Sequence, residues 1–82
     1  MDTKSSWADD YGVDSVLVRF GNRVRELRKK KGLSQEGLAL ESGLDRSYVG
    51  GVERGERNIS LVNMDKLARA LGTSVCNLLA FH

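Results

Sequence analysis

Residues 35–54 contain two short apolar patterns of helical spacing with a glycine between them. Two helices as short as these bury a shared apolar face only when they cross at a steep angle, through a turn of about three or four residues. Such a turn needs a residue that tolerates positive φ, which Gly43 supplies, and a small residue at the close approach, which Ala39 supplies. The inward-facing apolar residues are Leu38, Leu44, Val49 and Val52. The segment therefore predicts two crossed helices joined by a tight turn, and this pair constrains the fold more than any other feature.

Three further helices are predicted around this pair. Apolar residues recur at three- and four-residue steps over about 14–31 and 61–71, and a short last pattern covers 75–79. The pattern over 61–71 consists of Leu61, Met64, Leu67, Ala68 and Leu71. The N-cap candidates are Ser34, Asp45, Ser60 and either Thr73 or Ser74. Because no alternating strand pattern is present, we expect an all-α fold, a compact five-helix bundle.

The composition excludes several classes of protein. The 82 residues suffice for one domain, expected over 14–82 after an N-terminal tail over 1–13. No apolar run of roughly eighteen residues is present to cross a membrane, and the polar N-terminus lacks the apolar stretch of a signal peptide, so we expect a cytoplasmic protein. One histidine, one cysteine and no clustered carboxylates leave nothing to build a catalytic or metal site. We therefore expect no enzyme, no metal and no cofactor.

The basic residues are concentrated in one segment. The formal net charge of the chain is +2, but residues 1–18 carry −3, residues 19–31 carry +6 and the remainder carries −1. A basic helix of this kind suits an anionic partner. The same charge run fits an ordinary solvated helix face equally well, so the charge supports a nucleic-acid partner only together with the crossed helices.

The sequence from Leu27 to Gly72, LRKKKGLSQEGLALESGLDRSYVGGVERGERNISLVNMDKLARALG, resembles the helix-turn-helix domains of the Cro and lambda-repressor superfamily. The resemblance covers about residues 20–79. Within that superfamily, the segment DRSYVGGVERGERN is most similar to the controller proteins of restriction–modification systems. This resemblance implies a lambda-repressor-like fold and a sequence-specific transcriptional regulator, which binds palindromic operators in double-stranded DNA as a homodimer.

The resemblance also assigns roles to individual residues. It makes the helix over 46–54 the recognition helix, which lies in the major groove with its N-terminal residues on base edges. The implied base contacts are Arg46, Ser47, Tyr48 and Arg57. The implied contacts to the DNA backbone are Gln35, Arg54 and Asn58, with a brace for the recognition helix as the alternative role of Gln35. An acidic residue beside DNA would be repelled, and the family pattern instead pairs Glu53 with Arg28 as a structural clamp.

Two adjacent glycines interrupt the predicted recognition helix. Gly50 and Gly51 should cost roughly 0.8–1.0 kcal/mol each relative to alanine in a helix interior. Close approach of the helix to DNA or to a neighbouring helix would compensate for this cost, and the sequence leaves both open.

The apolar residues beyond those needed for the core lie at the C-terminal end, where they predict a dimer interface. They are Val75, Leu78, Leu79 and Phe81. RNA polymerase is a further expected partner, with Glu36 and Glu41 on the second helix as the candidate contacts.

Three alternatives to a controller protein remain open at this stage. The chain also fits a phage-type repressor or an antitoxin, both of which bind DNA. From another class, it fits a protein-interaction module that has kept the fold and lost DNA binding. The presence of Arg46, Ser47, Arg54 and Arg57 argues against such a module, because a helix that no longer meets DNA has no need of them.

Overall fold

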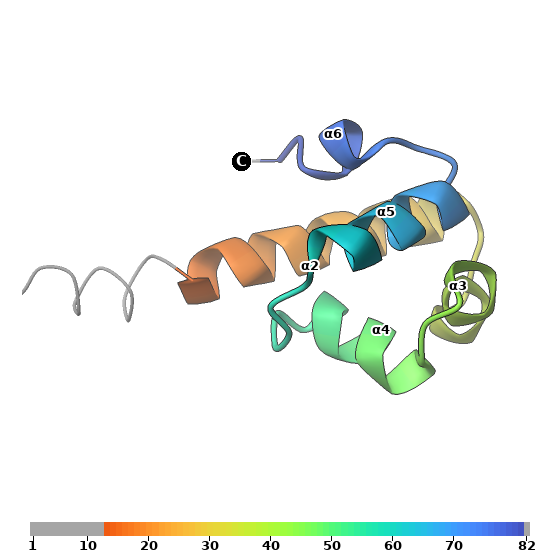
Figure 1. Cartoon of the computed structure of the whole chain (residues 1–82), viewed down its shortest axis with the longest axis horizontal. Coiled ribbons are helices and arrows are strands. Elements are labelled where there is room, and N and C mark those ends of the chain that lie inside the picture. Colours follow the sequence, from red (N-terminus) through yellow and green to blue (C-terminus); the bar gives the residue numbers. More distant parts are fainter. Residues whose placement is uncertain (1–12, 82) are drawn as a thin grey trace, which may run out of the picture.

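The computed structural model describes residues 13–81, with side chains from residue 16 onward. Five helices follow one another over this range, and no strand is present among the described residues (Figure 1). They are α2 (Val13–Lys30), α3 (Gln35–Ser42), α4 (Arg46–Glu53), α5 (Leu61–Ala70) and α6 (Val75–Leu78). The all-α, five-helix prediction is confirmed. Of the tail predicted over 1–13, only Val13 is described, as the first residue of α2, and the rest lies outside the described residues.

Local signals set most of the helix boundaries. Ser34, Ser60 and Ser74 each adopt extended backbone angles, and each hydroxyl accepts a hydrogen bond from the backbone N–H three residues later. Gly43 ends α3 in the left-handed region at φ +75°, as the turn of the crossed pair requires. Asp45 takes the N-cap position of α4, but its side chain makes no capping hydrogen bond.

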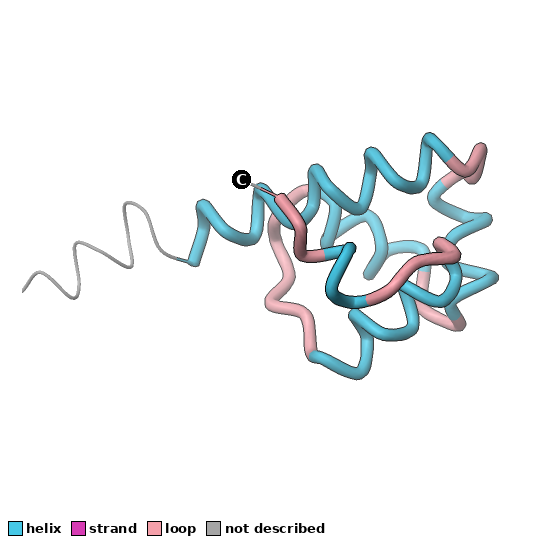
Figure 2. Tube along the Cα trace, turned by 90° about the horizontal axis from the view of Figure 1, so that it is seen from above, coloured by secondary structure: helices cyan, strands magenta, loops and turns pink. Residues whose placement is uncertain are grey.

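The long helix α2 packs against α4 and α6, and α3 packs against α4 and α5. The crossed pair α3 and α4 lies on one side of α2 and α5, and α6 lies on the other side (Figure 1). Seen from above, the described chain consists of helices joined by short loops (Figure 2). The core contains at least one residue from each of the five helices, and its fully buried apolar side chains are Val24, Leu38, Val49, Leu67 and Leu78.

Two glycines allow the segment around α4 to approach α2 closely. A Cβ atom on Gly21 would lie 2.4 Å from the carbonyl oxygen of Val52 and 2.6 Å from that of Glu53. A Cβ atom on Gly55 would lie 2.8 Å from a methyl group of Val18. Only hydrogen fits at these points, so the end of α4 is seated directly on the α2 backbone.

Basic residues of α2 and Lys31, just after its end, bind other parts of the chain. The Arg23 guanidinium donates to the backbone oxygen of Asn77 at 2.8 Å and to its side-chain oxygen at 3.2 Å. The Lys31 ammonium donates to the Ala70 carbonyl at 2.8 Å. Part of the +6 segment therefore holds α5 and α6 in place, in addition to any role with an anionic partner.

Two apolar residues differ from their predicted environments. Leu61 belongs to the predicted apolar pattern of its helix, yet its side chain is 67 % exposed, because it lies in the first turn of α5 before that helix reaches the core. Leu78 was predicted at a dimer interface, and this is wrong. Its side chain is fully buried within the chain, packed in the central core, and has no surface left for a partner.

No helix in the described range is both long enough and apolar enough to cross a membrane. Between residues 13 and 81, no group of three or more histidine, cysteine, aspartate or glutamate residues is arranged to hold a metal ion.

Candidate nucleic-acid interface

The first turn of α4 presents a cation and a hydroxyl to solvent. Arg46 and Ser47 are both exposed, and Asp45 just before them leaves the first backbone N–H groups of the helix without a side-chain acceptor. Free N–H groups at a helix N-terminus attract anions such as phosphate. This end of α4 therefore offers hydrogen-bond donors from both the backbone and the Arg46 side chain.

The opposite end of α4 is held by a buried carboxylate. Glu53 is 1 % exposed, and its side chain accepts hydrogen bonds from Arg28 Nε at 2.6 Å and Arg28 Nη2 at 3.0 Å. Gln35 Nε2 donates to the same carboxylate at 2.9 Å. Arg25 Nη2 donates to the Glu53 backbone oxygen at 2.9 Å. One carboxylate thus joins α2, α3 and α4, and it fixes the crossing of the two short helices.

Folding favours the charged form of Arg28 in this cluster. The hydrogen bond to Glu53 raises the pKa of Arg28 above its ordinary value, the negative charge of Glu53 adds to the rise, and burial opposes it. A cation whose pKa is raised on folding stabilises the folded state at every pH below its ordinary pKa. Arg28 therefore stays charged throughout the pH range in which DNA binding is measured.

Gln35 and Glu53 meet at the first turn of α3. The family resemblance implies either a contact to the DNA backbone or a brace for the recognition helix at Gln35. The structure places its amide on the Glu53 carboxylate, with the side chain partly exposed. The contact to DNA stays a prediction.

Two arginines lie along the glycine face of α4. A Cβ atom on Gly50 would come within 3.0 Å of Arg54 Nη1, and one on Gly51 would come within 3.0 Å of Arg57 Cγ. Arg54 also pairs with Glu56 at 3.1 Å. Arginine side chains of the same chain therefore lie against the two glycines. From the sequence, only DNA or a neighbouring helix was expected at this place.

Tyr48 points to α5 rather than standing free on the surface. Its hydroxyl accepts a hydrogen bond from Asn63 Nδ2 at 3.1 Å, and the Arg57 guanidinium carbon lies 5.6 Å from its ring centroid. Asn58, predicted to contact the DNA backbone, is exposed. Neither the role of Asn63 nor the packing of Arg57 carries a signal in the sequence, because both depend on how α5 is placed beside α4.

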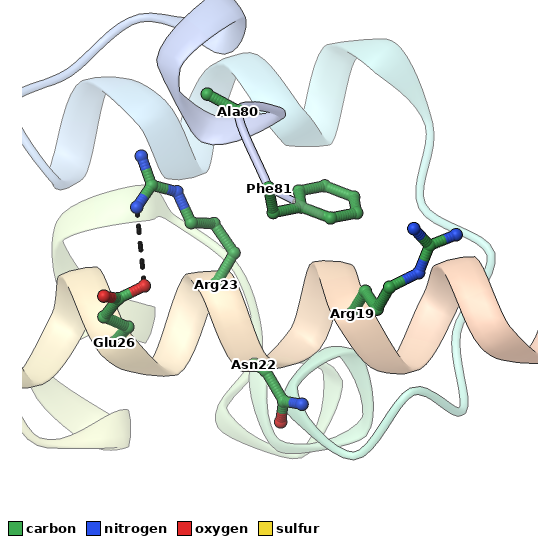
Figure 3. A pocket seen from close by; sticks show the side chains of 6 residues that line it. All are labelled: Arg19, Asn22, Arg23, Glu26, Ala80 and Phe81. Atoms are coloured by element: carbon green, nitrogen blue, oxygen red, sulfur yellow. Dashed lines mark hydrogen bonds and ion pairs between the residues drawn. The ribbon is translucent and has the colours of Figure 1, made fainter.

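A separate open pocket of about 370 Å³ lies between α2 and the residues after α6 (Figure 3). It is on the side of α2 away from α4. Its lining residues are Arg19, Asn22, Arg23, Glu26, Ala80 and Phe81. The Phe81 ring closes one wall, packed edge-on against Phe20 at a centroid distance of 6.3 Å. Phe81, predicted at a dimer interface, is therefore at least partly engaged within its own chain.

Comparisons of the sequence and of the structure with known proteins find similar helix-turn-helix proteins. Residues 24–78 match the helix-turn-helix family model. The chain is 43 % identical over 67 residues to control protein C.MunI of Mycoplasma sp, an alignment that covers 80 % of this chain and 90 % of the relative. It is 69 % identical to the crystal structure of the restriction–modification controller protein C.AhdI from Aeromonas hydrophila, with a TM-score of 0.75 over 76 % of this chain and 94 % of that one.

A third similar structure includes DNA. It is the restriction–modification controller protein C.Esp1396I, solved as a tetramer in complex with its natural 35 base-pair operator. That chain is 33 % identical, with a TM-score of 0.70, and the match covers 73 % of this chain and 79 % of that one. From the family match, the identities and the shared fold, the chain belongs to the helix-turn-helix family and, within it, to the controller proteins of restriction–modification systems.

Proposed function

We propose that this protein regulates transcription in a restriction–modification system by binding operator DNA through α4. The proposal rests on the difference between the two ends of α4, of which the first is exposed and the last is buried. Its first turn presents Arg46 and Ser47 to solvent, and its last residue, Glu53, is locked in the buried cluster with Arg28. A helix held rigidly at one end and exposed at the other can enter the major groove with a fixed orientation. The complex of C.Esp1396I with its operator supports this reading.

Arg46 is the residue that reads sequence in this proposal. A guanidinium can donate two hydrogen bonds to O6 and N7 of guanine, which no other base presents in the major groove. Ser47 adds a single hydrogen bond to a neighbouring base edge. Gln35, Arg54 and Asn58 contact phosphates and fix the register, and these contacts carry no sequence information by themselves.

Replacing Arg46 with alanine is expected to weaken operator binding by about 1–3 kcal/mol and to relax base choice at one position in each half-site. Lys66→Ala removes the same charge from an exposed position on α5 and is the matched control. It should produce a smaller loss that disappears as salt is raised, because only long-range attraction to phosphate is affected. Fluorescence anisotropy titrations at several salt concentrations measure both effects. Equal losses for the two variants, with unchanged base preference, would remove Arg46 from the readout.

Homodimerisation is part of the same proposal, because two copies related by a two-fold axis read two half-sites about one DNA turn apart. The apolar surface available for it includes Leu79, which is 45 % exposed, and the half-buried Val75. Leu61 and Val62 on α5 are also exposed and join the proposed interface. Leu78 has no part in it.

Leu79→Glu is expected to weaken self-association about tenfold or more, because a charge without a partner in an apolar interface costs on the order of 1–3 kcal/mol. The matched control is Leu40→Glu on α3, where the leucine is 80 % exposed and lies outside the proposed interface. Sedimentation equilibrium gives both dissociation constants. If the two variants associate as tightly as the unchanged protein, the interface lies elsewhere.

RNA polymerase is a further partner in this proposal. Glu36 and Glu41 are exposed on α3 and flank the exposed Leu40, so this helix presents an acidic and apolar surface. Transcription in vitro that is unaffected by alanine at both glutamates would remove RNA polymerase from the proposal.

A further inference from the structure

A hydrogen bond connects the recognition helix to α5. The Tyr48 hydroxyl, on α4, accepts from Asn63 Nδ2 at 3.1 Å. The backbone N–H of Asn63 is used separately, as the donor to the Ser60 cap at 3.1 Å. The Asn63 side chain can therefore be changed without removing the cap of α5, and its amide acts on Tyr48 alone.

Arg57 lies between the Tyr48 ring and the backbone of Gly51. Its guanidinium carbon is 5.6 Å from the ring centroid, a cation–π distance. On the other side, a Cβ atom on Gly51 would meet Arg57 Cγ at 3.0 Å and Arg57 Nε at 3.3 Å. The exposed Arg57 side chain therefore lies along α4, so close to Gly51 that a Cβ there would crowd it.

Gly50 differs from Gly51 in what it faces. Its nearest neighbour is Nη1 of Arg54, at the flexible end of that side chain, and Gln35 Oε1 follows at 3.4 Å. A Cβ at position 50 needs only the tip of an arginine to move. A Cβ at position 51 meets Arg57 near the base of its side chain, at 3.0 Å from Cγ, so the stem of that side chain must shift by a few tenths of an ångström.

We propose that Gly51 and Asn63 are positioning residues of the DNA interface, which set the direction of Arg57 through the Tyr48 ring. The inference rests on the proposed function and on the base contact that the family resemblance implies for Arg57. A long side chain that is already ordered loses less conformational entropy when it meets DNA than one that is free in solution. The arrangement thus raises affinity without adding a contact of its own to DNA.

The test measures Asn63→Ala and Gly51→Ala in two backgrounds, the unchanged protein and Arg57→Ala. The probe is the duplex that the unchanged protein selects from a random pool. With Arg57 present, each variant should weaken binding about three- to tenfold, the scale of one lost hydrogen bond. With Arg57→Ala, neither should weaken it further. The melting temperature of Gly51→Ala should stay equal or rise, because alanine favours the helix, so stability and affinity change in opposite senses.

Gly50→Ala is the matched control, and whatever affinity it costs should be the same in both backgrounds. Losses from Asn63→Ala and Gly51→Ala that are equal with and without Arg57 would overturn the proposal, as would full affinity in either variant. A failure of the proposed function would give a different experimental result. In that case the unchanged protein selects no sequence, or Arg46→Ala binds as tightly as the unchanged protein.

Discussion

Replacing Glu53 with glutamine is expected to lower the free energy of unfolding by about 3–5 kcal/mol, because the change leaves a buried guanidinium without its counter-charge. Arg28 is 8 % exposed and donates two hydrogen bonds to Glu53, at 2.6 and 3.0 Å. Glutamine keeps the shape and one acceptor oxygen but supplies no charge and only half of the acceptors. In a domain of this size, each kcal/mol corresponds to about 4–8 °C, so the melting temperature should fall by more than about 10 °C.

The control for this change is Glu56→Gln. Glu56 pairs with Arg54 at 3.1 Å, but both side chains are more than half exposed, and an ion pair in water contributes about 0–1 kcal/mol. Thermal unfolding followed by circular dichroism compares the two variants directly. Equal melting temperatures for Glu53→Gln and Glu56→Gln would show that the buried cluster does not hold the motif together.

Replacing Gly21 with alanine is expected to destabilise the fold by about 2 kcal/mol or more. The new Cβ would lie 2.4 Å from the Val52 carbonyl oxygen and 2.6 Å from that of Glu53. Both obstacles are backbone atoms, which cannot turn aside as a side chain can, so α4 must move away from α2. Overpacking of this kind costs about 1–3 kcal/mol and sometimes more, which exceeds the roughly 1 kcal/mol that alanine gains in helix propensity.

Gly37→Ala separates the clash with backbone atoms from the gain in helix propensity. Gly37 is also in a helix, but a Cβ there would meet only side-chain atoms, the nearest being Ser34 Oγ at 3.3 Å. This variant should be as stable as the unchanged protein or more stable, while Gly21→Ala unfolds at lower denaturant concentration. If urea unfolding shows Gly21→Ala to be as stable as Gly37→Ala, the close crossing of α2 and α4 is contradicted.

The parts of the fold that could be predicted are those that local chemistry determines. Ser34 and Ser60 cap helices because a hydroxyl can satisfy a free backbone N–H three residues away, and Gly43 ends α3 because it adopts positive φ. These signals lie within a few residues of the boundary they set. Together with the apolar periodicity, these signals predict all five described helices.

The parts that could not be predicted depend on contacts between helices. Gly21 lies inside a helix pattern and has no local signature, although it decides how closely α4 packs. Leu61 and Leu78 are both leucines in regular apolar patterns, yet one is exposed and the other is fully buried. Only the placement of α5 and α6 against α2 distinguishes them.

The candidate site shows the same division. Arg46 and Ser47 were predicted as base contacts from the family resemblance, and both are exposed in the first turn of α4. Asn63 was not considered, because fifteen positions separate it from the Tyr48 hydroxyl to which it donates. A residue that acts through a second and a third side chain becomes visible only when the helices are placed together.

The central claim is that α4 reads DNA sequence on behalf of a two-fold symmetric dimer. Selection of bound duplexes from a random pool, run in parallel with the unchanged protein and Arg46→Ala, tests it most directly. The unchanged protein should recover a palindrome whose half-sites are about one DNA turn, roughly 34 Å, apart, and Arg46→Ala should lose preference at one position in each half-site. Recovery of no preferred sequence by the unchanged protein, or of the same sequence with equal strength by Arg46→Ala, would contradict the account.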